Sequence, residues 1–165
     1  MMPVQQISVE RFSVVSARPF ADVLAAIHAA IGHPNLGEMQ REVAATATYS
    51  AMEAVIEKAL GPTGLMEFMR LDMGSYLAKG RTGATPKSFR LLVGNPLIMR
   101  SMAEHVPDVA SYAPVTLLID ERGDGVHLTY DRMASFLASY RNEAASKVAA
   151  DLDRKVEAML TEAAG

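Results

Sequence analysis

The 165-residue sequence contains no cysteine, and this absence excludes several kinds of chemistry. Without thiols the chain offers no disulfide, no thiolate nucleophile, no iron–sulfur cluster and no cysteine-ligated zinc. An excess of basic residues is missing too: 16 Lys and Arg stand against 19 Asp and Glu, for a formal net charge of −3. Because a general nucleic-acid-binding protein is normally clearly basic, we do not expect nucleic acid as a partner.

Long hydrophobic runs are also absent, although 50% of the residues are hydrophobic. No apolar stretch approaches the roughly 20 residues that a membrane-spanning helix needs. Residues 1–10 show no basic start, no apolar run of signal-peptide length and no small-residue cleavage site. We therefore expect a cytoplasmic protein with no membrane partner. A chain of this length buries its own core, so residues 1–165 are predicted to form a single domain.

Motifs that identify a reaction are missing as well. The sequence has neither phosphate-binding glycine pattern, Gly-x-x-x-x-Gly-Lys or Gly-x-Gly-x-x-Gly, and no Gly-x-Ser-x-Gly nucleophile turn. Its four histidines lack metal-binding spacing, and no His-Glu-x-x-His occurs. No metal and no cofactor is therefore expected, and the sequence favours a binding or interaction domain over an enzyme.

Apolar residues at helical spacing predict three helical regions. A first helix follows Pro19, because proline is tolerated in the first turn. The segment of about 34–62 begins with a capping box at Asn35 and is predicted to be a helical insertion. Near the C-terminus, the apolar stripe predicts an extended helix over about 132–162, with a break near Asn142.

β-rich runs predict five strands, and the last two are joined by an Asp-Gly turn typical of a hairpin. The predicted strands cover residues 12–17, 65–73, 89–93, 114–120 and 126–130. Most of these strands can be connected as hairpins. We therefore predict an α+β fold in two layers, with helices on one face of an antiparallel sheet and the order β-α-(α)-β4-α.

Three segments of the C-terminal half carry a family resemblance. Phe89–Pro96 places Gly-Asn-Pro after a strand, Ala113–Ile119 begins a strand with Pro-Val, and the hairpin strand Gly125–Asp131 ends in Tyr-Asp. Together they resemble the bacterial and archaeal family known as domain of unknown function 302. The resemblance covers about residues 8–33 and 65–140. It implies a TATA-box-binding-protein-like fold and a homodimer, but no mechanism, because no activity is established for the family.

Strand alternation sorts the side chains of the predicted sheet onto two faces. Nine residues are predicted to lie beneath the helices: Phe89, Leu91, Val93, Val115, Leu117, Ile119, Val126, Leu128 and Tyr130. The same reasoning places Met69, Leu71 and Met73 inward. The opposite face then carries Arg70, Asp72, Arg90, Leu92, Thr116, Leu118, His127 and Thr129.

That second, mixed face has three interpretations. It is a solvated surface with ion pairs, a dimer interface, or a small-molecule cleft with apolar walls and convergent polar groups. Charge adds one observation, because the segment 73–103 holds five basic residues, no acid, and Gly-Asn-Pro at a strand end. Backbone amides and an arginine there could hold a carboxylate or phosphate. Alternatively, the basic residues are solvated and Asn-Pro is an ordinary turn.

The sequence thus predicts a homodimer that binds a small, anionic, partly apolar ligand without catalysis. The predicted ligand-binding residues are Arg90, Gly94, Asn95, Pro96, His127 and Thr129. Arg90 would clamp the anion, Asn95 would orient the ligand, and His127 and Thr129 would form a polar wall. Two alternatives stay open: an enzyme with Asp72 and His127 as an acid/base pair, or a purely structural dimerisation module.

Overall fold

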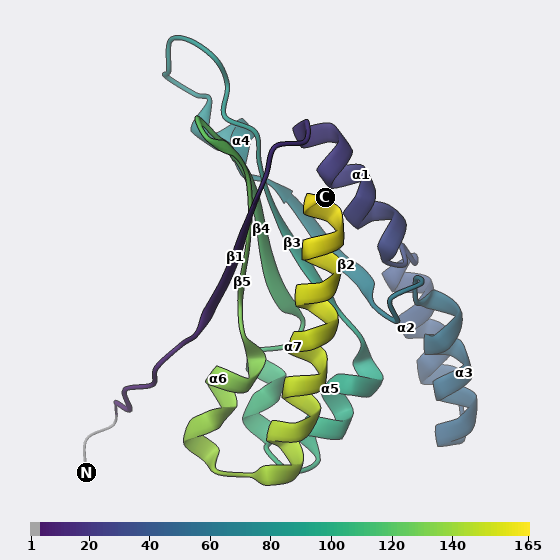
Figure 1. Ribbon diagram of the computed structural model, residues 1–165. Coiled ribbons are helices and arrows are strands. Elements are labelled where there is room, and N and C mark those ends of the chain that lie inside the picture. The colour runs from purple at the N-terminus through teal and green to yellow at the C-terminus, as the bar shows by residue number, and fades with distance from the viewer. Residues whose placement is uncertain (1–3) are drawn as a thin grey trace.

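The computed structural model describes residues 4–165 as a five-stranded antiparallel sheet with helices on one face (Figure 1). The strands are β1 (Arg11–Ser16), β2 (Met66–Asp72), β3 (Ser88–Gly94), β4 (Val115–Arg122) and β5 (Gly125–Asp131). Their order across the sheet is β1-β5-β4-β3-β2, and every neighbouring pair is antiparallel. The predicted α+β class and antiparallel sheet are confirmed.

Seven α-helices and two short 3-10 turns complete the described part of the chain. They are α1 (Phe20–Ala30), α2 (Leu36–Ala45), α3 (Tyr49–Ala59), α4 (Met73–Leu77), α5 (Pro96–Ala103), η1 (Pro107–Ser111), α6 (Met133–Leu137), η2 (Ala138–Tyr140) and α7 (Glu143–Ala164). Helices α1 and α7 lie across the same face of the sheet (Figure 1). Over residues 4–165, none of these helices is long and apolar enough to span a membrane.

The C-terminal helical region is divided where the sequence predicted a break. Arg141 adopts a left-handed conformation with φ 52°, which ends the preceding turn. The side chain of Asn142 then accepts a hydrogen bond from the Ala145 backbone N–H at 2.9 Å and starts α7. An N-cap of this kind satisfies an amide that would otherwise have no partner in the first turn.

The core lies between the sheet and the helical layer. Eight of the nine strand residues predicted to face inward are buried, and the ninth, Phe89, is half-buried and stacks on Phe20 of α1. Helix α7 adds its own apolar stripe, from Ala145 to Ala164, to the same cluster. This covered face fixes the orientation of the opposite one, which carries the candidate site.

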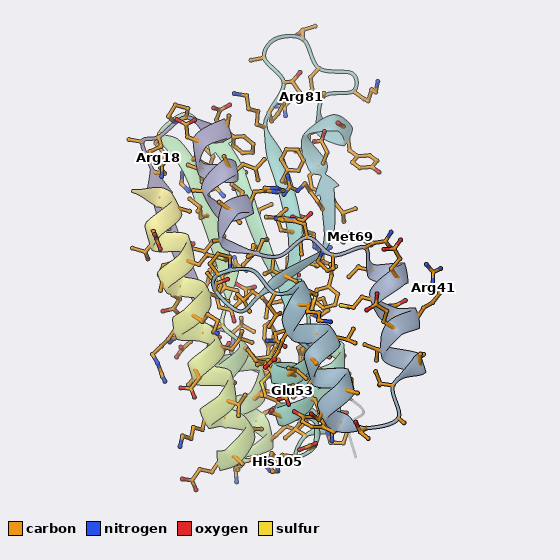
Figure 2. The ribbon with its side chains drawn as sticks, turned by 90° about the vertical axis from the view of Figure 1, so that its right-hand side faces the viewer. Arg18, Arg41, Glu53, Met69, Arg81 and His105 are labelled. Atoms are coloured by element: carbon orange, nitrogen blue, oxygen red, sulfur yellow. The ribbon has the colours of Figure 1, made fainter. Side chains whose placement is uncertain are left out.

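The predicted insertion consists of two helices rather than one, with the break at residues 46–48. The α2–α3 hairpin stands at the side of the body, where Figure 2 labels Arg41 and Glu53. Its two ends meet at Gly32 and Gly61. A Cβ at Gly32 would lie 1.9 Å from the Ala59 carbonyl oxygen, so glycine is required for this close approach.

Strand β2 corrects one part of the predicted face assignment. A bulge lies between Glu67 and Met69, and beyond it Arg70 pairs with the inward-facing Leu91 while Leu71 pairs with Arg90. Met69 and Leu71 therefore lie on the uncovered face, and the prediction that they point inward is wrong. β2 is an edge strand, and its covered side holds polar contacts, including Arg70 Nη2 at 3.2 Å from His28 Nδ1.

Candidate functional site

The face of the sheet opposite α1 and α7, called here the open face, carries a groove of about 600 Å³. One row of side chains runs directly across it. Ser13 of β1, Thr129 of β5, Leu118 of β4 and Arg90 of β3 are successive cross-strand neighbours. The first three line the groove, whereas Arg90 is not one of its lining residues and lies next to Leu118, in contact with the groove residue Thr116. The predicted placement of Arg90, His127 and Thr129 on one face is confirmed.

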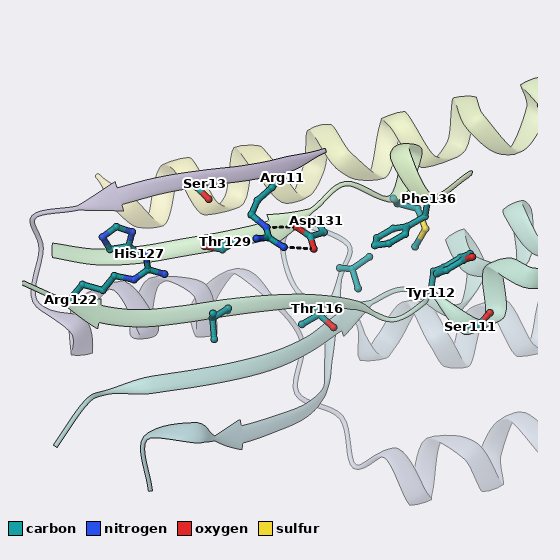
Figure 3. A pocket seen from close by; sticks show the side chains of 13 residues that line it. Arg11, Ser13, Ser111, Tyr112, Thr116, Arg122, His127, Thr129, Asp131 and Phe136 are labelled. Carbon is teal, nitrogen blue, oxygen red and sulfur yellow. Dashed lines mark hydrogen bonds and ion pairs between the residues drawn. The ribbon is translucent and has the colours of Figure 1, made fainter. Parts of the chain in front are cut away.

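One side of the groove is an ion pair between Arg11 of β1 and Asp131 of β5 (Figure 3). Two nearly parallel contacts join them, Nε–Oδ1 at 2.6 Å and Nη2–Oδ2 at 2.9 Å. The hydrogen bond from the guanidinium lowers the pKa of Asp131, while the carboxylate raises the pKa of Arg11. Both groups therefore stay charged, and their charges cancel at this side of the groove.

At the hairpin end of the groove, Arg122 and His127 each have an acidic partner. Arg122 Nε lies 2.6 Å from Asp120 Oδ2, and His127 Nε2 lies 2.8 Å from Asp124 Oδ1. The hydrogen bond to His127 lowers the pKa of Asp124, so this carboxylate stays ionised next to the imidazole. His127 thus lines the groove, and its acidic partner comes from the hairpin turn.

Two aromatic rings close the other end of the groove. Tyr112, directly after η1, and Phe136 of α6 stack with centroids 5.0 Å apart and planes 13° from parallel. The Tyr112 hydroxyl lies 3.4 Å from that of Tyr140, which donates to Asp108 Oδ2 at 2.8 Å. Figure 3 shows both rings at the end of the groove away from His127 and Arg122.

Arg90 differs from the other cations of this face. Its Nη2 lies 3.4 Å from Thr116 Oγ1, so its guanidinium extends towards β4 and the groove. Among residues 4–165 it takes part in no ion pair, whereas Arg11 and Arg122 each bind a carboxylate. Arg90 therefore retains donors for an anion that enters from solvent.

Gly94, Asn95 and Pro96 lie elsewhere, at a second cavity of about 200 Å³. There Asn95 caps α5: its Oδ1 accepts from the Leu97 N–H at 2.8 Å, and its Nδ2 donates to the Gly64 carbonyl at 3.0 Å. Gly-Asn-Pro is thus the start of a helix that the sequence did not predict. Of the six predicted ligand-binding residues, only His127 and Thr129 line the groove of the open face, and the three Gly-Asn-Pro residues lie at the second cavity.

The predicted acid/base pair of Asp72 and His127 is wrong. Asp72 pairs across β2 and β3 with Phe89, which faces the helices, whereas His127 lies on the open face. Asp72 is instead the N-cap of α4, where it accepts hydrogen bonds from the backbone and the hydroxyl of Ser75. Those hydrogen bonds, the one from the hydroxyl first, lower the pKa of Asp72.

Sequence reasoning missed most of the groove. Its further side chains come from β1, the β4–β5 hairpin, η1 and α6: Arg11, Arg122, Asp131, Tyr112 and Phe136. Arg122 lies two residues after Asp120, the last residue of the predicted strand, and β4 extends to Arg122 in the structure, so the two side chains share a face. The pairing of β1 with β5 is long-range and left no local signal for Arg11 and Asp131.

No cluster of three or more metal-ligating His, Cys, Asp or Glu side chains occurs among the described residues. Of the charged side chains that line the groove, Arg11 and Asp131 bind each other, and Arg122 binds Asp120. The arrangement is suited to hydrogen bonding and charge recognition at Arg90 and to stacking at Tyr112 and Phe136.

Comparison with known proteins gives the family. The sequence matches the family described as "Domain of unknown function DUF302" over residues 39–163. The chain belongs to this family. The match includes most of the α2–α3 segment and begins after β1 and α1. Among curated proteins, no relative matches the chain.

A solved structure supports the fold of this DUF302 protein. The crystal structure of an uncharacterized conserved DUF302 protein from Bacillus stearothermophilus is similar, with a TM-score of 0.64 at 11% sequence identity. The similarity covers 94% of this chain and 98% of the other. At this identity the likeness shows a common fold and carries no information on a ligand. The family resemblance predicted from the sequence is confirmed.

Proposed function

We propose that this DUF302 protein binds a small organic anion in the groove of the open face. The observation that carries the proposal is Arg90, a cation beside the groove that contacts the groove residue Thr116 and has no carboxylate partner within residues 4–165. Guanidinium groups bind carboxylates and phosphates through strong, charge-assisted hydrogen bonds. The anionic end of the ligand would lie between Arg90 and the hydroxyl groups of Thr116 and Thr129.

The remaining walls define the rest of the ligand. The groove volume of about 600 Å³ lies within the range of about 300–1,000 Å³ typical of small-molecule sites. Leu118 supplies an apolar floor beside Arg90, and Asp131 offers carboxylate oxygens to a hydroxyl or amino group. A partly apolar anion with a hydrogen-bond donor matches these surfaces.

The neutralised arginines act differently from Arg90. Since Arg11 and Arg122 are each bound to an aspartate, they attract an anion weakly and chiefly hold the rims of the groove in place. Arg90 is therefore expected to provide most of the charge recognition. Substitution of Arg90 is therefore the decisive test of the proposed anion site.

The first prediction concerns Arg90→Gln, which removes the charge and retains a polar side chain. Carboxylates and phosphates are first screened with the unaltered protein by the shift of its thermal unfolding. We expect the variant to bind every hit at least about tenfold more weakly, because hydrogen bonds to a charged group contribute about 1.5–3 kcal/mol. Dissociation constants from titration calorimetry measure the change.

Arg154→Gln provides the matched control. Arg154 lies on α7, is exposed, and pairs with Asp151, away from the open face. Its substitution is expected to leave all dissociation constants unchanged. Hits that bind equally well to the unaltered protein and to Arg90→Gln would contradict the proposed role, and a screen without hits would contradict the groove as an anion site.

The proposal includes the homodimer that the family resemblance implies. Met69, 49% exposed, and its cross-strand neighbour Leu92 give the open face an apolar side beyond the groove. Apolar side chains on an exposed sheet face suit a self-complementary contact with a second copy. The mass of the protein in solution tests this part separately from ligand binding.

A further inference from the structure

We infer that the ligand of the groove is an aromatic anion, with its ring placed against Tyr112 and Phe136. This inference rests on the proposed function and adds the chemical class of the ligand. It starts from the aromatic end of the groove, where the two rings lie 5.0 Å apart and nearly parallel. Both rings are half-buried, so part of each remains accessible from the groove.

The two rings are held in position before any ligand binds. The hydroxyl of Tyr112 is linked through Tyr140 to Asp108, and the hydrogen bond from Tyr140 to Asp108 measures 2.8 Å. Phe136 is anchored by α6, whose neighbouring residues Met133 and Leu137 are buried in the core. An ordered aromatic wall binds a flat ring with little loss of side-chain entropy.

The polar groups next to this wall determine how such a ring would lie. Thr116 belongs to β4, which begins three residues after Tyr112, and its hydroxyl contacts the guanidinium of Arg90. Asp131 lies two residues before the start of α6 and borders the same space (Figure 3). A ring stacked on the wall therefore directs an acidic substituent towards Arg90 and Thr116.

The closing experiment compares two ligands of equal charge. The probes are 2-naphthoate and decahydronaphthalene-2-carboxylate, which have the same carbon skeleton with and without aromatic rings. Binding is followed by NMR titration of the full-length protein. We expect naphthoate to bind about two- to tenfold more tightly, because aromatic pairs add to the affinity beyond the area they bury.

Three variants connect that preference to the wall. Phe136→Leu is expected to remove the preference for the aromatic probe, whereas Tyr112→Phe keeps the ring and is expected to retain it. Phe89→Leu makes the same chemical change at the covered face, where Phe89 stacks on Phe20, and is expected to leave the preference unchanged. Thermal unfolding of each variant verifies that it folds.

The outcomes separate this inference from the proposed function. If both probes bind equally and both lose affinity in Arg90→Gln, the aromatic preference is wrong and the anion site stands. If a preference persists undiminished in Phe136→Leu, the ring contact lies elsewhere and the inference is overturned. If neither probe binds, the inference and the proposed function are both contradicted.

Discussion

Asp153 of α7 is fully buried and binds three donors from the corner between β5 and α6. Its Oδ1 accepts from the Tyr130 hydroxyl at 2.6 Å and the Met133 N–H at 2.7 Å, and its Oδ2 accepts from the Ala134 N–H at 3.0 Å. Burial is the main cause of the raised pKa of Tyr130, followed by the nearby charge of Asp153, so the phenol stays protonated as a donor. This network joins the sheet to both C-terminal helices and places α6, which carries Phe136.

Replacement of this carboxylate is predicted to destabilise the whole fold. Asp153→Ala leaves the Tyr130 hydroxyl and the Ala134 amide without their acceptor, while the Met133 amide keeps only its 3.1 Å hydrogen bond to the Tyr130 oxygen. Since a buried group that loses its hydrogen bond costs about 1–3 kcal/mol, we expect a loss on the order of 3 kcal/mol in the free energy of unfolding. Urea denaturation followed by circular dichroism measures it.

Asp151→Ala is the matched control for that experiment. Asp151 lies on the same helix, is exposed, and pairs with Arg154, so its loss is expected to change stability by less than about 0.5 kcal/mol. Equal effects of the two substitutions would show that the buried network does not stabilise the fold.

Two asparagine caps allow a prediction at the scale of the helix. Asn142 caps α7, which has nine buried residues, whereas Asn35 caps α2, which has none. Asn142→Ala is expected to lower global stability by about 1 kcal/mol, because an amide of the first turn loses its partner. Asn35→Ala is expected to leave global stability nearly unchanged and to accelerate amide exchange within α2. Denaturation and hydrogen exchange distinguish the two results.

The contrast depends on coupling between each helix and the core. If Asn35→Ala lowered global stability as much as Asn142→Ala, α2 would be coupled to the core more strongly than its contacts indicate. If neither substitution had an effect, side-chain capping would not contribute to these helices.

The success of sequence reasoning differed between central and edge strands. Alternation predicted the faces of β3, β4 and β5, because both neighbours of each central strand and the helical layer impose the same burial pattern. It failed for β2, where the bulge after Glu67 interrupts the alternation and the covered side admits ion pairs. Alternation shows which residues share a face, but at an edge it does not show which face is buried.

Across the whole molecule, the groove depends on contacts that no local pattern contains. Arg11 and Asp131 are separated by 120 residues, and the antiparallel pairing of β1 with β5 places them directly opposite each other. Tyr112 and Phe136 meet because η1 and α6 both lie at one end of the sheet. The sequence located Arg90, His127 and Thr129 on the open face, but their partners required the topology.

The α2–α3 hairpin is predicted to be dispensable for folding of the rest of the chain. Of its residues, Ile56 is the buried one, and Gly32 and Gly61 bring the two ends of the segment into contact. In a variant with residues 34–59 replaced by a Gly-Gly link, we expect cooperative unfolding and a stability lower by about 1.5–3 kcal/mol, the contribution of one buried aliphatic side chain. The 15N–1H spectrum of the variant should retain the amide signals of the sheet. A loss of cooperative unfolding would show that the hairpin belongs to the folding unit. That result would agree with the family match, which includes most of the hairpin within residues 39–163.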